Sequence, residues 1–274
     1  MTHQHVFPPT LERDYPVEGG RIVTRSLEAH VVDHCNLTCA QCCSLSPHLQ
    51  PWFVDAEQLA RDLELAARVL RPRVFKLVGG EPLLHPELVE LVRVVRRSGI
   101  APRISLTTNG LLLERTPDEL WAELDAMTIS LYPRPALPQR AIAAIEARAT
   151  RFGVALNWKR QAEFVVMTRH ERCEDPVTTG EIFAECWLRE RCHMIRDGRF
   201  YMCTRPPHFQ SYLPDADLSD DGIGLHDGPG LVERLRAYLL REQPLEACFH
   251  CHGGRAAMVP HRLLSRSDLV RARR

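Results

Sequence analysis

Residues 27–42 read Leu-Glu-Ala-His-Val-Val-Asp-His-Cys-Asn-Leu-Thr-Cys-Ala-Gln-Cys, and this stretch decides the fold. Its first six residues form a short and mostly apolar run, which predicts a buried strand over 27–32. Cys35, Cys39 and Cys42 follow at once, with the spacing C-x3-C-x2-C. The sequence therefore places three thiols on one loop at the end of a buried strand.

Strand and helix patterns alternate along the chain after this loop. Apolar residues recur at helical spacing between Asp55 and Leu70, and Asp55 is placed to cap this helix. The next helix begins at Pro86 and is placed to end before Gly99. Further strands are predicted at 74–78, 104–107, 127–131, 154–158 and 163–168, and further helices at about 117–123 and 138–152. This alternation predicts an α/β fold with a parallel sheet whose strands are joined by right-handed crossovers.

Two polar motifs stand at the ends of predicted strands. Gly-Gly-Glu-Pro occupies 79–82, where bare backbone allows a ligand to approach and Glu81 offers a carboxylate that can pair with an amino group. Thr-Thr-Asn-Gly occupies 107–110 and offers hydroxyl and amide groups that can bond ribose hydroxyls. Either motif alone is more often a turn than a site. The carboxyl ends of parallel strands meet at one edge of the sheet, where such folds carry their function.

Composition excludes several classes of protein. The 274 residues include 35 basic and 35 acidic side chains, so the net charge is zero and no nucleic-acid partner is expected. No apolar run approaches the roughly 18–20 residues that span a bilayer. The first 20 residues lack the basic and apolar regions of a secretory signal. We therefore expect a cytoplasmic protein without a membrane partner.

The ten cysteines fall into two groups, one within 35–43 and the other within 173–251. In a reducing compartment, clustered thiols indicate metal or redox chemistry. Three thiolates on one loop can each hold one iron of a 4Fe–4S cluster, which leaves the fourth iron open to a chelating ligand. A structural zinc site is the alternative, with Cys43, His34 or His48 as its fourth ligand.

The cysteine loop and the two strand-end motifs, taken together and in this order, resemble those of the radical S-adenosylmethionine (radical SAM) enzymes. The resemblance covers about residues 27–170 and implies a partial (β/α)6 barrel. It implies a cluster held by Cys35, Cys39 and Cys42, whose open iron is chelated by the amino and carboxylate groups of S-adenosylmethionine. Many members carry an aromatic residue just before the last cysteine, where this chain has Gln41.

The resemblance also assigns the residues that bind this cofactor, with the Gly-Gly-Glu-Pro segment contacting its amino group. These residues are Gly79, Gly80, Glu81, Pro82, Thr107, Thr108, Asn109 and Ser130. The implied reaction uses one electron from a partner such as flavodoxin or ferredoxin. Cleavage of the cofactor then gives methionine and a 5′-deoxyadenosyl radical, which abstracts a hydrogen atom from the substrate.

The second cysteine group lies in a segment that resembles the small twitch or SPASM appendage of the same enzymes. Asp197-Gly198 predicts a hairpin between 194–195 and 200–201, followed by a last helix at about 230–241. The resemblance implies one auxiliary 4Fe–4S cluster. Its implied ligands are Cys203, Cys248 and Cys251, with a fourth that is either Cys192, which hairpin geometry favours, or Cys186, which the spacing to Gly198 favours. A zinc ribbon is the alternative, and Cys43 and Cys173 have no assigned role.

The expected organisation is a poorly packed lead-in at 1–26, a barrel at 27–170, the twitch appendage at 171–260 and a frayed basic tail at 261–274. No leader-peptide recognition domain fits before residue 27, so a small-molecule substrate is expected.

We expect a carbohydrate-like or aminocyclitol substrate of secondary metabolism, such as antibiotic biosynthesis, and an oxidation or an epimerisation. Candidate polar contacts to it are Tyr132, Arg134, Lys159, Arg205 and His208. Peptide modification with a separate recognition protein is a second hypothesis. A non-catalytic zinc-binding module is the third.

Overall fold

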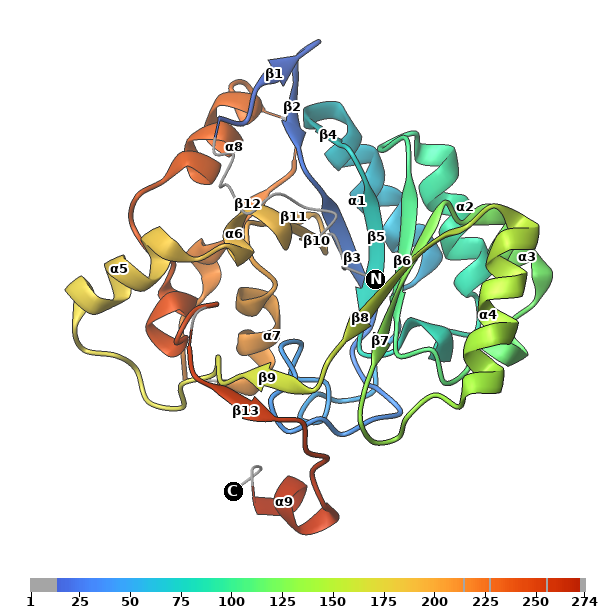
Figure 1. Cartoon of the computed structure of the whole chain (residues 1–274). Coiled ribbons are helices and arrows are strands. Elements are labelled where there is room, and N and C mark those ends of the chain that lie inside the picture. The colour runs from blue at the N-terminus through green and yellow to red at the C-terminus, as the bar shows by residue number, and fades with distance from the viewer. Residues whose placement is uncertain (1–13, 214, 227, 255, 272–274) are drawn as a thin grey trace.

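The centre of the molecule is an eight-stranded sheet in the order β12-β11-β10-β3-β5-β6-β7-β8 (Figure 1). The structure is a computed structural model that describes residues 14–271 apart from 214, 227 and 255. Five strands run parallel and in chain order, namely β3 (Leu27–Val32), β5 (Phe75–Gly79), β6 (Ile104–Thr108), β7 (Ala126–Leu131) and β8 (Ala155–Arg160). Each matches a predicted strand, and the α/β class is confirmed; these five strands form an open wall rather than a closed barrel.

The helices that join these strands cover one face of the sheet (Figure 1). They are α1 (Ala56–Val69), α2 (Leu88–Ser98), α3 (Asp118–Glu123) and α4 (Gln139–Phe152). The predicted cap of α1 is confirmed, because the Asp55 carboxylate accepts hydrogen bonds from the N–H groups of Glu57 at 2.9 Å and Gln58 at 3.0 Å. Gly99 ends α2 with a φ of 60°, as predicted for a glycine in the left-handed region.

The two faces of the parallel sheet differ in polarity. Leu77, Leu106 and Met127 are in register and buried toward the helices. Alternate residues along each strand point the opposite way. Most of these are polar, and we call the surface they form the inner face: Glu28, His30, Lys76, Ser105, Thr107, Thr128, Ser130, Asn157 and Lys159. A polar face on a central sheet indicates a ligand-binding surface rather than a packing surface.

The predicted hairpin is confirmed and extends the same sheet. β10 (Met194–Arg196) and β11 (Arg199–Tyr201) are joined by Asp197 and Gly198, whose φ values of 51° and 70° are those of a type I′ turn. β10 pairs in parallel with β3, and β12 (Ile223–Gly224) pairs with β11. The expected domain boundary at residue 170 is therefore not a break in the sheet.

The strand predicted at 163–168 lies outside the central sheet. β9 (Glu163–Val165) pairs antiparallel with β13 (Met258–Pro260) instead of following β8 as a sixth parallel strand. The physical reason is the connection, since only residues 161–162 separate β8 from β9. A parallel crossover needs about a dozen residues or more.

The described part of the lead-in is well packed, which corrects the sequence expectation. β1 (Val17–Glu18) and β2 (Arg21–Thr24) form a small sheet with β4 (Leu70–Pro72). Ile22 is fully buried, and Tyr15 is buried with its hydroxyl 3.3 Å from His193 Nε2. Residues 1–13 lie outside the described residues.

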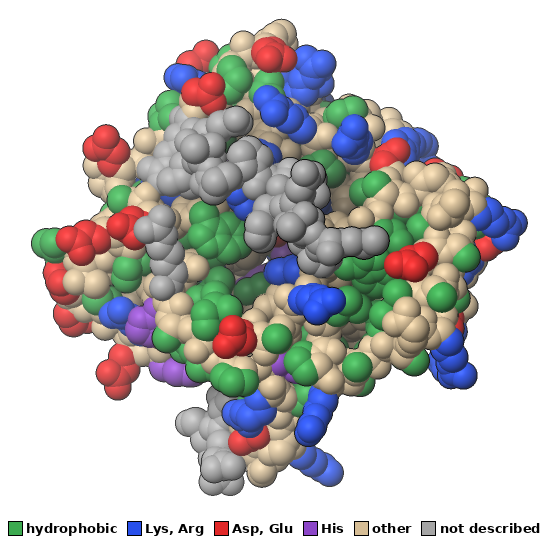
Figure 2. All heavy atoms as spheres, viewed as in Figure 1, with side chains coloured by type: hydrophobic (Ala, Val, Ile, Leu, Met, Phe, Trp, Pro, Cys, Tyr) green, Lys and Arg blue, Asp and Glu red, His purple; other side chains and the backbone are tan. Residues whose placement is uncertain are grey.

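The last third of the chain packs beside the hairpin and carries short helices. They are α5 (Pro176–Glu185), α6 (Leu188–Arg191), α7 (Arg205–Tyr212), α8 (Leu231–Leu240), which confirms the predicted last helix, and α9 (Arg266–Arg271). On the face in Figure 2, acidic side chains gather on the α5 side and basic ones on the α3–α4 side. None of the helices described has the length and apolarity to cross a membrane.

Candidate metal and cofactor site

The cysteine loop leaves the carboxyl end of β3 and is held by its own turns. Cys42 N–H donates to Cys39 O at 3.2 Å, and Leu45 N–H donates to Cys42 O at 3.0 Å. Leu37 N–H points at Cys35 Sγ from 3.4 Å. Backbone hydrogen bonds therefore fix the positions of the thiols without a bound ligand.

The three thiols are close enough to affect one another. Burial, followed by the neighbours Cys42 and Cys35, raises the pKa of Cys39 to about 12. Burial also raises the pKa of Cys35 to about 12, with Glu81 and Cys42 adding to the effect. The pKa of Cys42 is raised by burial and by Cys43. A cation bound at this loop would lower these pKa values again, because metal binding deprotonates a coordinating thiol.

The donor set fits a 4Fe–4S cluster. Among the residues that the structure describes, no three His, Cys, Asp or Glu side chains converge closely enough to hold a single metal ion. In a four-iron cluster each thiolate binds its own iron, so the thiols stand further apart than around one ion. Three soft thiolates on a loop of fixed shape meet that requirement.

The Gly-Gly-Glu-Pro segment packs directly on the base of the cysteine loop. A Cβ on Gly79, whose φ is 143°, would lie 2.2 Å from Val32 O, and one on Gly80 would lie 2.0 Å from His34 O. Gly80 N–H donates to Val32 O at 2.6 Å, and Glu81 N–H donates to His34 O at 3.1 Å. Only glycine permits this approach, which joins the ends of β3 and β5.

Glu81 joins this segment to the Thr-Thr-Asn-Gly motif. Its fully buried carboxylate accepts hydrogen bonds from Thr108 Oγ1 at 2.6 Å, Asn109 N–H at 2.8 Å and Leu83 N–H at 3.0 Å. Burial raises the pKa of Glu81 to about 7, against the effect of these three donors. These three donors join the ends of β5 and β6 through Glu81, and its pairing with an amino group stays a prediction. Pro82 begins the buried turn η1 (Pro82–Leu84).

Asn109 reaches back to the cysteine loop. Its side-chain N–H group lies 2.7 Å from Asn36 Oδ1 and 3.8 Å from Cys35 Sγ. Thr107 and Ser130 lie on the inner face, on neighbouring strands. Burial, followed by the Cys39 and Cys42 thiols, raises the pKa of Tyr132 well above its usual range, which places this phenol beside the loop. The motifs that the sequence singled out thus meet at one end of the sheet.

The candidate substrate contacts fall into three kinds. Arg134 and Lys159 are exposed, and Tyr132 is half-buried. Arg205 is buried and donates to Cys43 O at 2.9 Å and to Thr168 Oγ1 at 3.2 Å. The remaining candidate, His208 on α7, is buried and contacts His30 of the inner face.

A network that the sequence did not reveal runs beneath the loop on the inner face. His208 Nε2 lies 2.8 Å from His30 Nδ1, and His30 Nε2 lies 3.5 Å from Glu28 Oε1. Lys76 Nζ lies 2.5 Å from Glu28 Oε2. Although burial alone opposes it, Lys76 together with His30 lowers the pKa of Glu28 to about 2. The charge of Lys76 is therefore neutralised within the sheet.

The second cysteine group converges behind the hairpin. Cys203 follows β11, Cys186 ends α5, and Cys248 lies in the turn η4 (Glu246–His250), just before Cys251. Burial raises the pKa values of Cys186, Cys203 and Cys248. Among the neighbouring groups, Cys251 raises all three values, and Cys186 raises those of Cys203 and Cys248.

Cys192 stands to one side of that group. Burial raises its pKa to about 12, and the next largest effects come from Glu28 and Lys76. Cys192 raises the pKa of Cys203, whereas it is not among the main causes of the raised pKa of Cys248. The structure thus brings Cys186 together with the other three thiols and places Cys192 against the inner face.

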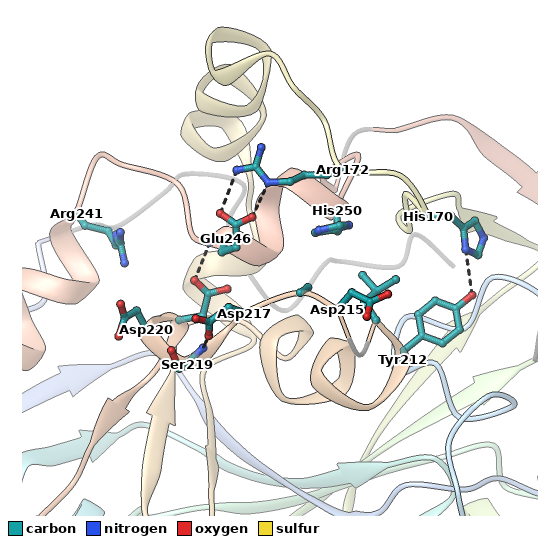
Figure 3. A pocket seen from close by; sticks show the side chains of 13 residues that line it. His170, Arg172, Tyr212, Asp215, Asp217, Ser219, Asp220, Arg241, Glu246 and His250 are labelled. Atoms are coloured by element: carbon teal, nitrogen blue, oxygen red, sulfur yellow. Dashed lines mark hydrogen bonds and ion pairs between the residues drawn. The ribbon is translucent and has the colours of Figure 1, made fainter.

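A cavity of about 780 Å³ flanks α7 and η4 (Figure 3). Carboxylates such as Asp215, Asp217 and Asp220 line it, together with His170. No cysteine or strand-end motif residue is among its described lining residues. This cavity is therefore separate from the cysteine loop.

Comparison with known proteins finds sequence similarity around the cysteine loop and structural similarity for the fold. The sequence profile of the Radical SAM superfamily matches residues 30–132. GTP 3′,8-cyclase of Streptomyces coelicolor is 36% identical over 116 residues, which are 41% of this chain and 34% of that protein. The enzyme of the same name from Mycobacterium marinum is 33% identical over 163 residues, or 57% of this chain and 37% of that protein. The chain thus spans about a third of the length of these curated relatives.

A crystal structure of BtrN in complex with AdoMet and 2-DOIA has the same fold, with a TM-score of 0.54 and 16% identity. The similarity covers 86% of this chain and 96% of BtrN. The matched profile contains the cysteine loop and both strand-end motifs. Residues 30–132 of the chain therefore match the radical SAM superfamily, a family that uses a 4Fe–4S cluster and S-adenosylmethionine.

Proposed function

We propose that this protein is a radical SAM enzyme that abstracts a hydrogen atom from a small polyhydroxylated ring, such as a carbohydrate or aminocyclitol, and oxidises or epimerises it. The observation that carries this proposal is the polar inner face. Thr107, Thr128 and Asn157 are in register on three adjacent strands, and Asn157 Nδ2 donates to Thr128 Oγ1 at 3.3 Å. Such hydroxyl and amide groups complement the hydroxyls of a sugar-like ring.

The charges of the inner face favour a substrate of low net charge. Lys76 and Glu28 neutralise each other, so the pair presents dipoles rather than a free cation. Lys159 is exposed at the end of the outermost parallel strand. An amine or a hydroxyl is matched to this surface better than a group with several negative charges.

The residues of the loop and the strand ends would hold the cofactors. Cys35, Cys39 and Cys42 would bind the cluster, which together with S-adenosylmethionine supplies the hydrogen-abstracting radical. The Gly-Gly-Glu-Pro segment supplies backbone groups, while Glu81 keeps that segment joined to Asn109. Thr107 and Ser130 would bind the ribose from the inner face. An external one-electron donor of the flavodoxin or ferredoxin class completes the system.

An auxiliary 4Fe–4S cluster on Cys186, Cys203, Cys248 and Cys251 is part of the same proposal. These four thiols affect one another in the structure, which favours Cys186 over Cys192 as the fourth ligand. In an oxidation, the substrate radical must lose a second electron, and an auxiliary cluster would receive it. BtrN, which shares the fold, was crystallised in complex with AdoMet and 2-DOIA, and this small-molecule complex supports the proposal.

A purine nucleotide is the second candidate substrate. The relatives named GTP 3′,8-cyclase favour it, with up to 38% identity over 111 residues. The inner face offers little to hold a triphosphate, because Lys76 is paired with Glu28, which leaves Lys159 as the exposed cation among the residues that define this face.

The proposal is tested with anaerobically reconstituted protein, S-adenosylmethionine and dithionite. Formation of 5′-deoxyadenosine should rise when aminocyclitols or sugars are added, and deuterium at the attacked carbon should appear in 5′-deoxyadenosine. The triple variant Cys35→Ala/Cys39→Ala/Cys42→Ala is the control and should give none. If only GTP stimulates the reaction, the second candidate replaces the first; if the reconstituted protein never forms 5′-deoxyadenosine, both fail.

A further inference from the structure

The segment 258–264 near the C-terminus lies along the cysteine loop. Leu264 N–H donates to Thr38 O at 2.7 Å, and Thr38 Oγ1 donates to Leu264 O at 3.0 Å. Ala40 N–H donates to Arg262 O at 2.8 Å. These bonds surround an antiparallel bridge between Cys39 and Leu263. We call residues 258–264 the strap; it adds a short strand to the loop that carries the thiols.

The strap also places an imidazole on one of those thiols. His261 Nε2 lies 3.3 Å from Cys39 Sγ. His261 packs against a pair of stacked rings, because its own ring lies 5.0 Å from that of Tyr132 and 5.4 Å from that of Phe164. Its backbone N–H donates to Ala162 O at 2.8 Å. The ring is therefore fixed by β9, by the end of β7 and by the strap itself.

We propose that the strap is part of the cluster site and that His261 donates an Nε2–H hydrogen bond to the Cys39 sulfur, which tunes the potential of the cluster. This inference rests on the proposed binding of the cluster by Cys35, Cys39 and Cys42. A thiolate has no hydrogen to donate, so the imidazole must be the donor in this contact. His261 acts through Cys39 and is a positioning residue rather than a catalytic one.

The expected effect follows from charge. One-electron reduction adds negative charge to the cluster and its sulfurs, and a donor on a sulfur stabilises that charge more than the charge of the oxidised form. Loss of the donor should therefore make the reduction potential more negative. A tenfold change in the reduction equilibrium corresponds to about 59 mV for a one-electron couple.

The experiment compares wild type with His261→Phe and His261→Gln by redox titration followed by electron paramagnetic resonance. The signal of the loop cluster is identified as the one that changes when S-adenosylmethionine is added. His261→Phe keeps an aromatic ring but lacks the donor, so its potential should fall by about 59 mV. His261→Gln keeps an N–H donor and should restore most of the difference. His226→Phe changes an exposed histidine of another loop and should leave the potential at the wild-type value.

Equal potentials in wild type and His261→Phe would overturn the inference while leaving the proposed function in place. If phenylalanine does not pack against Tyr132 and Phe164, His261→Met also lacks a donor, and its reduction potential can be compared with that of wild type instead. The failure of the proposed function looks different. In that case wild type and the triple cysteine variant would contain the same amount of iron, and no signal would respond to S-adenosylmethionine.

Discussion

Replacing Gly80 by alanine should destabilise the protein and weaken iron binding at the cysteine loop. The added Cβ would lie 2.0 Å from His34 O, 2.4 Å from His34 C and 2.9 Å from Asp33 O. The first of these distances is 1.4 Å below the 3.4 Å at which ordinary contact begins. All three atoms belong to the backbone, so no side chain can rotate away to relieve the overlap.

The size of the loss in stability follows from the separation of the Gly80 backbone from the backbone of His34 and Asp33. Overpacking against a rigid neighbour costs about 1–3 kcal/mol. Separating the two segments also lengthens the bonds from Gly80 N–H to Val32 O, now 2.6 Å, and from Glu81 N–H to His34 O, now 3.1 Å. Each such bond contributes about 1 kcal/mol. The free energy of unfolding should therefore fall by about 3–5 kcal/mol, the sum of these two effects.

The measurement is urea unfolding of the cluster-free protein, together with iron and sulfide content after reconstitution. Gly180→Ala is the matched control, because Gly180 lies inside α5 and its added Cβ meets nothing within 4 Å. That change should raise the free energy of unfolding by about 0.5–1 kcal/mol. A Gly80→Ala protein with wild-type stability and full iron content would refute the close packing described here.

Three further predictions concern other parts of the structure. Cys186→Ser should remove about four irons per chain and Cys192→Ser none, as measured by iron content; the reverse result would assign Cys192 to the auxiliary cluster. The Arg196 guanidinium donates two hydrogen bonds to the Asp33 carboxylate, each 2.9 Å from nitrogen to oxygen, and 16% and 10% of the two side chains are exposed. Arg196→Met should therefore cost about 3 kcal/mol in urea unfolding, and Arg196→Met/Asp33→Asn should recover much of it; purely additive costs would exclude coupling. Burial raises the pKa of Asp221 from 3.8 to about 6, so the native state binds a proton between these values that the unfolded state lacks. In the cluster-free protein, the stability of wild type relative to Asp221→Asn should thus rise by about 2.4 kcal/mol as the pH falls from 7 to 4; a difference that stays constant with pH would contradict this.

Local signals in the sequence were sufficient to predict most strands of the sheet. The apolar run at 27–32 is β3, and Asp197-Gly198 is the hairpin turn, because each depends only on residues within a few positions. The same holds for the α1 cap at Asp55. Because 79–82 and 107–110 each follow a strand that was predicted to run parallel to the next, the sequence also predicted that the two motifs lie at one edge of the sheet.

The parts that could not be predicted depend on contacts between distant residues. His261 and Cys39 are 222 positions apart, and no spacing rule relates them. The predicted strands at 154–158 and 163–168 already leave too few residues for a parallel crossover, but β13, the partner of β9, lies far along the chain and no local pattern identifies it. The inward position of Glu81 likewise depends on Thr108 and Asn109, which approach only after β5 and β6 pair.

The separation between the cysteine loop and the strap has a consequence for biogenesis. A ribosome adds about 5–20 residues per second, so the 222 positions between Cys39 and His261 take about 10–45 s to synthesise. During that interval the nascent thiols lack the strand that later covers them. The loop therefore reaches its covered form only after the strap has been synthesised, and slow translation would prolong the period in which these cysteines are open to oxidation.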